Sequence, residues 1–172
     1  LGLYPGNAIT DKTPELIEAC KVSLLDRGFG QKNGANGSGW GKANKVNLWA
    51  RAKDGNRAYS MLRELINKNI APNLWDFHPP YQMDGNCGYT SGVCEMLCYS
   101  SDDIIELLPA LPEEWKNGSV KGLCARGGYS LDFTWENGEI KSLSVYSSCG
   151  KKTARIKTGA VSYTHLRAHE TD

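Results

Sequence analysis

The sequence predicts an α+β protein in more than one part, in which a run of helices precedes an antiparallel β module. Apolar residues recur at helical spacing through much of residues 1–101, and β-rich, alternating runs follow over residues 102–160. The dipeptide Asn137-Gly138, between two such runs, is typical of a two-residue hairpin. Because the strands follow the helices instead of alternating with them, two separate pieces are expected and not one α/β domain.

Four helices are predicted in the first part. The first begins at Pro14, with Thr13 as its N-cap, and ends before Gly28. The others are expected over residues 40–52, 58–66 and 90–100, each with an apolar stripe. The second and third helices should form an antiparallel hairpin whose turn is Asp54-Gly55-Asn56, with Asn56 capping the third helix.

Four strands are predicted in the second part, over residues 105–108, 119–125, 129–135 and 140–146. The composition breaks at residue 161, and we expect residues 161–172 to be an artefactual, disordered tail, since they resemble adapter-derived peptides at the ends of translated contigs. Its histidines, His165 and His169, have a spacing that can bind zinc on a helix. Because the tail is interpreted as an artefact, no metal site is predicted there.

The most informative segment is His78-Pro-Pro-Tyr-Gln-Met-Asp84-Gly-Asn-Cys-Gly88. Its prolines and glycines predict an irregular loop over residues 69–88, which would place Asp84 on a stiff turn before the fourth helix. A lone carboxylate on such a turn is a candidate catalytic group. The alternative is structural: Asp84 would cap a helix that starts near Thr90 or form an Asx-turn.

Four other residues are candidates for substrate binding: His78, Gln82, Asn86 and Trp40. Trp40 can stack on a sugar face, and a place in the core is the alternative. His78 can hydrogen-bond a substrate or cap a turn. Gln82 and Asn86 flank Asp84 and can orient it, or they can satisfy backbone groups of an irregular loop.

The composition argues against several classes of partner. The 20 basic and 19 acidic residues leave a net charge of +1 without any basic run, so nucleic acid is not an expected partner. No apolar stretch reaches the roughly 20 residues that span a bilayer, so no membrane is expected. No cofactor or metal is predicted either, since no Cys-x-x-Cys pair is present.

The six cysteines are expected to be free, mostly buried thiols, because Cys20, Cys94 and Cys98 occupy apolar positions of predicted helices. Free thiols favour a cytoplasmic location. An extracellular location stays open, because the chain begins without Met and we expect it to be a fragment that lacks its N-terminus.

Several motifs together resemble a known family. They are Leu3-Tyr-Pro-Gly6, Gly39-Trp40, Lys45-Val-Asn-Leu-Trp-Ala-Arg51, Asp54-Gly-Asn-Arg-Ala58, Pro72-Asn73-Leu74, Asp76-Phe-His-Pro-Pro80, Gln82-Met-Asp-Gly-Asn86, Leu107-Leu-Pro-Ala-Leu-Pro112, Trp115, Gly118-Ser-Val-Lys-Gly122 and Ala125-Arg-Gly-Gly128. In this order they are similar to the C-terminal part of glycoside hydrolase family 95, the inverting α-L-fucosidases.

The resemblance implies that residues 1–101 are the C-terminal helices of an incomplete (α/α)6 catalytic barrel, followed by a C-terminal β domain. It also implies a fucosylated oligosaccharide or glycan as substrate, with terminal α-linked fucose released. Asp84 matches the family's aspartate that orients the asparagines holding the attacking water, while a separate glutamate protonates the leaving oxygen. Those partners would lie upstream of Leu1, so the chain alone is expected to be inactive. One departure is Trp40-Gly41, where the family commonly has Trp-Ser.

Two other functions stay open at this stage. A family member with this sequence could act on α-L-galactosides, which differ from fucosides by one hydroxyl, a difference that an apolar pocket rejects only modestly. Alternatively, the strands could form a non-catalytic carbohydrate-binding or architectural module that uses Trp115 and Trp135.

Overall fold

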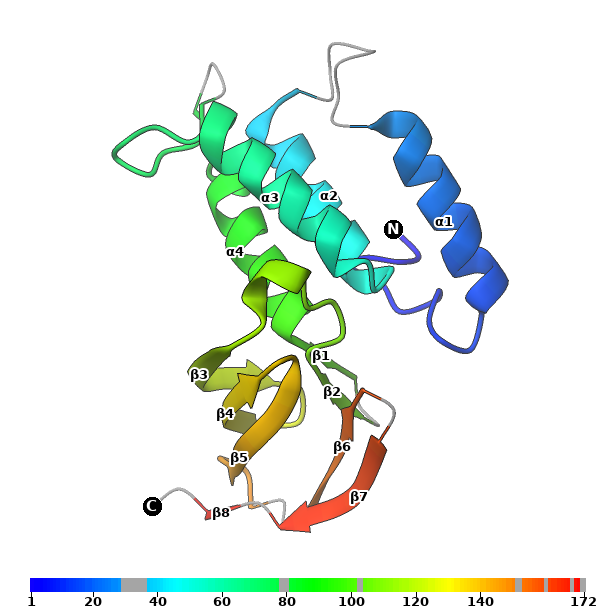
Figure 1. Cartoon of the computed structure of the whole chain (residues 1–172), viewed down its shortest axis with the longest axis vertical. Coiled ribbons are helices and arrows are strands. Elements are labelled where there is room, and N and C mark those ends of the chain that lie inside the picture. Colours follow the sequence, from blue (N-terminus) through cyan, green and yellow to red (C-terminus); the bar gives the residue numbers. More distant parts are fainter. Residues whose placement is uncertain are drawn as a thin grey trace.

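The computed structural model describes residues 1–28, 37–77, 81–101, 104–150, 153–159, 161–167 and 169–170. Helices gather at one end of the molecule and two small sheets at the other, as Figure 1 shows. The helices are α1 (Pro14–Arg27), α2 (Gly39–Arg51), α3 (Gly55–Asn69) and α4 (Met83–Leu97). The α+β class is therefore confirmed. In the described part of the chain, every helix is too short or too polar to cross a membrane.

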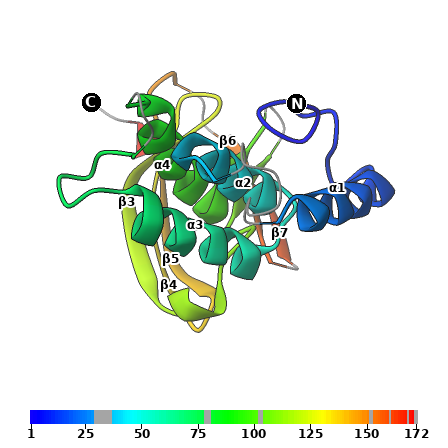
Figure 2. The same cartoon turned by 90° about the horizontal axis from the view of Figure 1, so that it is seen from above.

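Helix α1 has the predicted bounds, with Pro14 at its first position and Gly28 after its last. It lies beside α2, seen from above in Figure 2. The buried Lys45 side chain of α2 reaches across and donates a 2.7 Å hydrogen bond to the Gly28 carbonyl. A cation at the end of α1 complements the carbonyls that the helix leaves without partners there. Burial, together with the neighbouring charges of Arg27 and Lys42, lowers the pKa of Lys45.

Helices α2 and α3 form the predicted hairpin, but the cap differs from the prediction. Asp54 is the N-cap, and its carboxylate accepts a 3.0 Å hydrogen bond from the Arg57 backbone nitrogen. Asn56 instead binds the short 3-10 helix Glu113–Trp115, where its side chain accepts a 2.9 Å hydrogen bond from the Glu113 nitrogen. The cap lies two residues earlier because Gly55 already belongs to the helix.

The prediction for α4 was wrong at both ends. The helix begins at Met83, not near Thr90, and it ends at Leu97, where the chain passes directly into a strand at Cys98. Gly85 and Gly88 are therefore helical residues and not turn residues. Gly88 and Gly92 let α4 approach α2 closely: a Cβ on Gly88 would lie 2.9 Å from the Ala43 Cβ, and one on Gly92 would lie 2.5 Å from a Val46 methyl.

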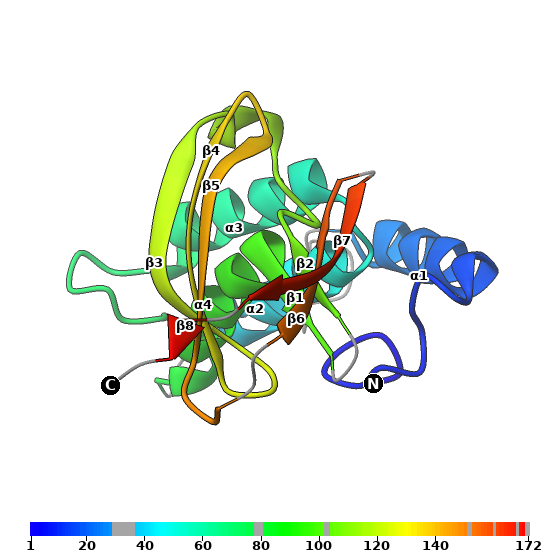
Figure 3. The same cartoon turned by 90° about the horizontal axis from the view of Figure 1, so that it is seen from below.

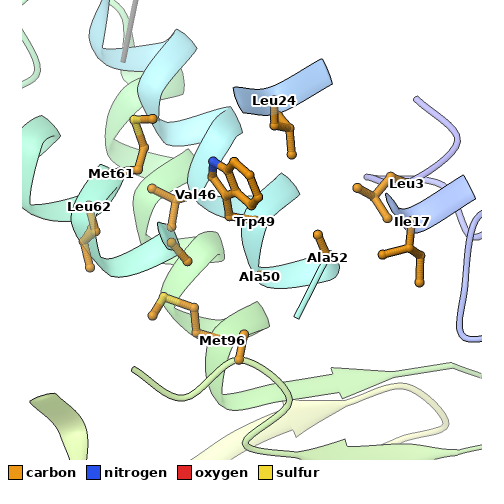
Figure 4. Packing of buried hydrophobic residues seen from close by; sticks show 12 residues of the cluster. Leu3, Ile17, Leu24, Val46, Trp49, Ala50, Ala52, Met61, Leu62 and Met96 are labelled. Atoms are coloured by element: carbon orange, nitrogen blue, oxygen red, sulfur yellow. The ribbon is translucent and has the colours of Figure 1, made fainter. Parts of the chain in front are cut away.

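The helices share one apolar core. Trp49 of α2 lies between the α1 side chain Leu24 and the rest of the bundle, and Met96 fills the end of the core nearest the sheets (Figure 4). Val46 and Met96 are fully buried. Since Leu3 also contributes, the segment before α1 is packed against the same core.

Among the described residues, the sheets contain eight strands: β1 (Cys98–Ser100), β2 (Ile105–Leu107), β3 (Gly118–Ala125), β4 (Tyr129–Glu136), β5 (Glu139–Ser147), β6 (Thr153–Thr158), β7 (Val161–Arg167) and β8 (His169–Glu170). One sheet has the order β1-β2-β6-β7 and the other β3-β4-β5-β8. Figure 3 shows the strands of both sheets from below. Side chains from both sheets enclose a second core that includes Leu131, Phe133 and Ile156. The hairpin at Asn137-Gly138 is present, with φ of 50° and 78° at the two residues.

The β part departs from the sequence-based expectation in three respects. Residues 98–100 form a strand and not the end of a helix, because they pair with β2. The module is not purely antiparallel, since β2 pairs with β6, and β5 with β8, in parallel. Disorder was expected from residue 161, yet β7 pairs with β6 from Thr158 to Thr153.

Candidate active site

Asp84 lies in the first turn of α4, at the end of the helices farthest from the sheets (Figure 1). It does not cap a helix at Thr90, because α4 already includes Thr90. Its side chain is exposed, and none of the described residues forms an ion pair or a side-chain hydrogen bond with it. The first turn of a helix attracts negative charge, so the carboxylate is compatible with its position and remains available to a further partner.

Asn86 binds protein and not Asp84. Its Oδ1 accepts a 3.1 Å hydrogen bond from the Asp76 nitrogen, and its Nδ2 donates a 2.5 Å hydrogen bond to the Leu74 carbonyl. Both ends of the amide therefore hold the loop that follows α3. This loop folds back on itself through a bridge between Ile70 and Asp76.

Trp40 and Gln82 lie near the same end of the helices. Trp40 is in the first turn of α2 and is 45% exposed, so it does not occupy the core. Gln82 precedes α4 at its N-cap position, is partly buried and makes no side-chain capping hydrogen bond. His78 lies outside the described residues, between Phe77 and Tyr81.

Large apolar side chains surround this end of the helices. Trp75 and Tyr81 stack on each other with ring centroids 4.8 Å apart, although 57% and 42% of their surfaces stay exposed. Phe77 and Met83 are exposed as well, at 60% and 61%. A group of exposed aromatic residues is typical of a surface that contacts a sugar or another part of a protein.

One residue of this region was missed by the sequence analysis as a candidate. Asp76 is only 2% exposed, and its carboxylate lies between Gly39 of α2 and Gly85 of α4. A Cβ on either glycine would overlap a carboxylate oxygen. The signal available in the sequence was an acidic residue between two aromatic residues, which is a poor place for an exposed charge.

A cavity of about 550 Å³ lies at the opposite end of α2, where Arg51 and Lys53 line it together with residues of β1, β2 and β6. Along α2 this is about 18 Å from the first turn that carries Trp40. Its charges are largely paired: Lys53 and Lys157 both contact Asp11 and Glu106, at 2.5 to 3.2 Å. The cavity is therefore distinct from the candidate site.

The tryptophans proposed for a carbohydrate-binding module are part of the packing. Trp135 is 5% exposed, and its Nε1 donates a 2.8 Å hydrogen bond to the Trp115 carbonyl. Trp115 meets the Tyr59 ring edge to face, with centroids 5.6 Å apart. Since Trp135 contributes to the sheet core, it offers no flat face to a glycan.

The cysteines are mostly exposed, contrary to the expectation. All six are free thiols, and Cys98 is the buried one. Burial, with smaller contributions from Glu95 and Cys94, raises the pKa of Cys98 to about 12. Within the described ranges, no group of three or more His, Cys, Asp or Glu side chains is arranged to hold a metal ion.

The family comparisons divide the chain where α4 ends. A model described as "Glycosyl hydrolase family 95 catalytic domain" matches residues 1–97, and one described as "Glycoside hydrolase family 95, C-terminal domain" matches residues 99–171. The helices thus correspond to part of a glycosidase catalytic domain. The chain belongs to glycoside hydrolase family 95.

Three curated proteins are similar to the chain. "Alpha-L-fucosidase 2" of Arabidopsis thaliana is 36% identical over 159 residues, which cover 85% of this chain and 18% of that protein. Two proteins named "Probable alpha-fucosidase A" are 33% identical over 159 residues in Aspergillus oryzae and 31% identical over 176 residues in Aspergillus niger. These matches cover 80% and 91% of this chain and 22% of each Aspergillus protein. The chain therefore spans about a fifth of the length of the curated relatives it matches.

Proposed function

We propose that the protein to which this chain belongs is an inverting, exo-acting α-L-fucosidase that removes terminal α-linked fucose from glycans. In this proposal α1 to α4 are the last helices of an (α/α)6 barrel, and the strands form its C-terminal β domain. The two family models and the names of the three relatives support this assignment.

The observation that carries the proposal is the placement of Asp84. An exposed carboxylate in the first turn of α4, without an ion-pair partner among the described residues, lies at the end of the helices where Trp40 is also exposed. A carboxylate that is already paired would have little effect on a further group, whereas Asp84 is available to accept hydrogen bonds from amide side chains.

The proposed chemistry follows from inversion. One group protonates the leaving oxygen on one side of the sugar, and water attacks from the other side. An asparagine amide is too weak a base to activate this water alone, so a carboxylate must polarise it. We assign that polarising role to Asp84, and we assign the water-holding asparagines and the acidic glutamate to residues upstream of Leu1.

The other candidate residues have separate roles in this proposal. Trp40 would contact the sugar through its exposed ring face, and Gln82 and His78 would hydrogen-bond hydroxyl groups. Asn86 would contribute mainly by holding the loop that leads to His78, since its amide is engaged with Leu74 and Asp76.

The chain alone is expected to be inactive, because this proposal assigns only one of several catalytic groups to it. It also exposes apolar side chains on α1, with Val22 at 66% and Leu25 at 49%. In the proposed barrel these residues would be covered by other helices. Fucose release by the purified 172-residue chain would contradict this part of the proposal.

The test uses the complete reading frame that contains these residues. The parent protein and its Asp84→Asn variant would be assayed on an α-L-fucoside and an α-L-galactoside, with the product anomer followed by NMR. Asp26→Asn is a matched control, because Asp26 is also an exposed helical aspartate. We expect inverted fucose from the parent and the control, and a loss of several powers of ten in Asp84→Asn, on the order of a missing catalytic group.

Three results would contradict the proposal. Full activity of the Asp84→Asn variant would show that Asp84 is not catalytic and has a structural role. Faster release of galactose than of fucose would assign the protein to α-L-galactosides. Absence of turnover on both substrates, with the parent folded, would contradict a catalytic function for it on these sugars.

A further inference from the structure

Asp76 is the charged residue of this region that the proposed reaction does not use. It is 2% exposed and lies in the middle of the loop between α3 and α4, paired with Ile70 through the backbone. Burying an ionised carboxylate is costly unless its surroundings favour negative charge. The position of its oxygens shows which parts of the chain lie next to them.

The two carboxylate oxygens of Asp76 face two different helices. Oδ1 is the atom that a Cβ on Gly39 would meet, and Oδ2 is the atom that a Cβ on Gly85 would meet. Gly39 is the first residue of α2, and Gly85 belongs to the first turn of α4. Both turns carry backbone N–H groups without helical partners, and both carry the positive end of a helix dipole.

The two glycines adjoin the candidate site residues. Trp40 follows Gly39, and Asp84 precedes Gly85. A group that holds the two glycines at a fixed separation therefore also sets the distance between Trp40 and Asp84. We propose that Asp76 is a positioning residue: its carboxylate joins the first turns of α2 and α4 and thereby fixes Asp84 relative to Trp40.

The surrounding contacts keep Asp76 in place. Asn86 of α4 accepts a hydrogen bond from the Asp76 nitrogen at 3.1 Å. On the other side, the Phe77 nitrogen donates to the Asn69 carbonyl at 2.5 Å, and the buried Lys42 of α2 donates to Asn69 Oδ1 at 2.8 Å. The loop is thus attached to α2, α3 and α4 within a few residues of the carboxylate.

The inference rests on the proposed function for its catalytic consequence, but not for its structural one. The test therefore uses two measurements on the complete parent protein. Steady-state kinetics on an α-L-fucoside gives kcat and KM, and kcat should fall if Asp84 is misplaced. Hydrogen exchange of the amides in residues 83–88 reports the order of the α4 first turn and needs no activity.

Asp76→Asn keeps the shape of the side chain and removes its charge. We expect kcat to fall on the order of 100-fold while KM changes by less than about threefold, as a misplaced catalytic group predicts. Exchange at residues 83–88 should become about tenfold faster. The Asp76→Glu variant keeps the charge, but its kcat should also stay below that of the parent, because the added methylene has no room between Gly39 and Gly85.

Asp54→Asn is the matched control. Asp54 also accepts a hydrogen bond at a helix N-terminus, but on α3 at the other end of the bundle. The Asp54→Asn substitution should lower the melting temperature without changing kcat or the hydrogen exchange of the amides in residues 83–88. If Asp76→Asn behaves like Asp54→Asn, Asp76 is merely structural and the proposal is overturned.

Two further outcomes are decisive. If Asp76→Asn yields too little folded protein, Gly39→Ala tests the same contact, since its methyl group would displace Oδ1; unchanged kcat and exchange in a folded Gly39→Ala would overturn the proposal. If the parent shows no fucosidase activity, the proposed function fails by itself. Faster exchange at residues 83–88 in Asp76→Asn would then still support the positioning role, and unchanged exchange would overturn it.

Discussion

The side-chain amide of Asn47 donates a 2.8 Å hydrogen bond to the carbonyl of Gly88, which joins the middle of α2 to the turn of α4 that follows Asp84. Asn47 is 1% exposed, and its Oδ1 accepts from the Ser91 hydroxyl at 3.0 Å. The Tyr4 hydroxyl lies 2.9 Å from Ser91 Oγ, so the same network reaches the N-terminal segment. A buried polar side chain thus holds three segments together.

Replacing Asn47 by Ala should lower the free energy of unfolding by about 2 kcal/mol, because the Gly88 carbonyl and the Ser91 hydroxyl both lose their bond to this buried amide. Urea unfolding of the wild-type chain and the variant measures the difference. Asn56→Ala is the control: Asn56 makes a similar pair of bonds to Glu113, but it is exposed, and the loss should stay below about 1 kcal/mol. Equal losses would contradict the role of burial.

The close approach of α2 and α4 makes a second prediction. Gly92→Ala would place a methyl group 2.5 Å from the Val46 Cγ1 atom, and Val46 is fully buried. We expect a loss of about 1–3 kcal/mol from overpacking, despite the higher helix propensity of Ala. Thermal unfolding checks the sign and the size of the change.

Two companion variants distinguish a steric effect from a general one. Val46→Ala should make Gly92→Ala less harmful, so the double variant should be more stable than the sum of the single effects predicts. Gly37→Ala should be neutral within about 0.5 kcal/mol, because no atom lies within 4 Å of its added Cβ. Additive effects of Gly92→Ala and Val46→Ala would show that the two side chains do not compete for space.

The ion-pair network between Asp11, Lys53, Glu106 and Lys157 predicts how stability depends on pH. Burial raises the pKa of Asp11, but hydrogen bonds and charges from Lys53 and Lys157 outweigh it, and the pKa falls below the usual 3.8. Burial likewise lowers the pKa of Lys157, but contacts with Glu106 and Asp11 outweigh it, and the pKa rises above 10.5.

A lowered carboxylate pKa contributes stability above the unfolded value of 3.8, and that contribution is lost as the pH falls through the folded pKa. A raised lysine pKa contributes stability below 10.5, and that contribution is lost as the pH rises through the folded pKa. We therefore expect the stability difference between the wild-type chain and Lys157→Met to be flat at intermediate pH and to shrink below about pH 4 and above about pH 10.5. Lys141→Met is the control: it breaks the exposed pair with Glu139 and should change the stability by less than about 1 kcal/mol.

The thiols should differ in reactivity. At pH 8 in the native protein, iodoacetamide should modify the exposed Cys87 and Cys124 and leave Cys98 intact, because Cys98 is buried and its pKa is raised to about 12. Intact-mass and peptide mass spectrometry would identify the modified positions. In concentrated urea all six thiols should react, and native labelling of Cys98 would indicate that the junction of α4 and β1 opens.

Local sequence signals were sufficient where the structure depends on local chemistry. Helix α1 begins after Thr13, at Pro14, and ends before Gly28, as predicted. The left-handed residues Asn137 and Gly138 form the hairpin between β4 and β5. In such places the start, the stop or the turn is encoded within a few residues.

The errors arose where distant contacts decide the structure. Gly85 and Gly88 suggest a turn when only their neighbours in the sequence are considered, but Asp76 packs against Gly85 and Ala43 of α2 packs against Gly88, and these contacts favour a helix. The parallel pairing of β2 with β6 joins residues about 50 positions apart and leaves no local signal. The place of the Asp76 carboxylate likewise depends on distant contacts, since Gly39 and Gly85 come from two different helices.

The direct passage from Leu97 of α4 to Cys98 of β1 has a consequence for how this architecture can evolve. Modules that are exchanged between proteins are usually separated by exposed, flexible linkers, in which a recombination point disturbs few contacts. Here the junction has no spacer, and the buried Cys98 on one side of it adjoins the buried Met96 on the other. A crossover at this point would graft a foreign sheet onto the base of the helix that carries Asp84. The β domain is therefore expected to be inherited together with α4 and not exchanged as an independent unit.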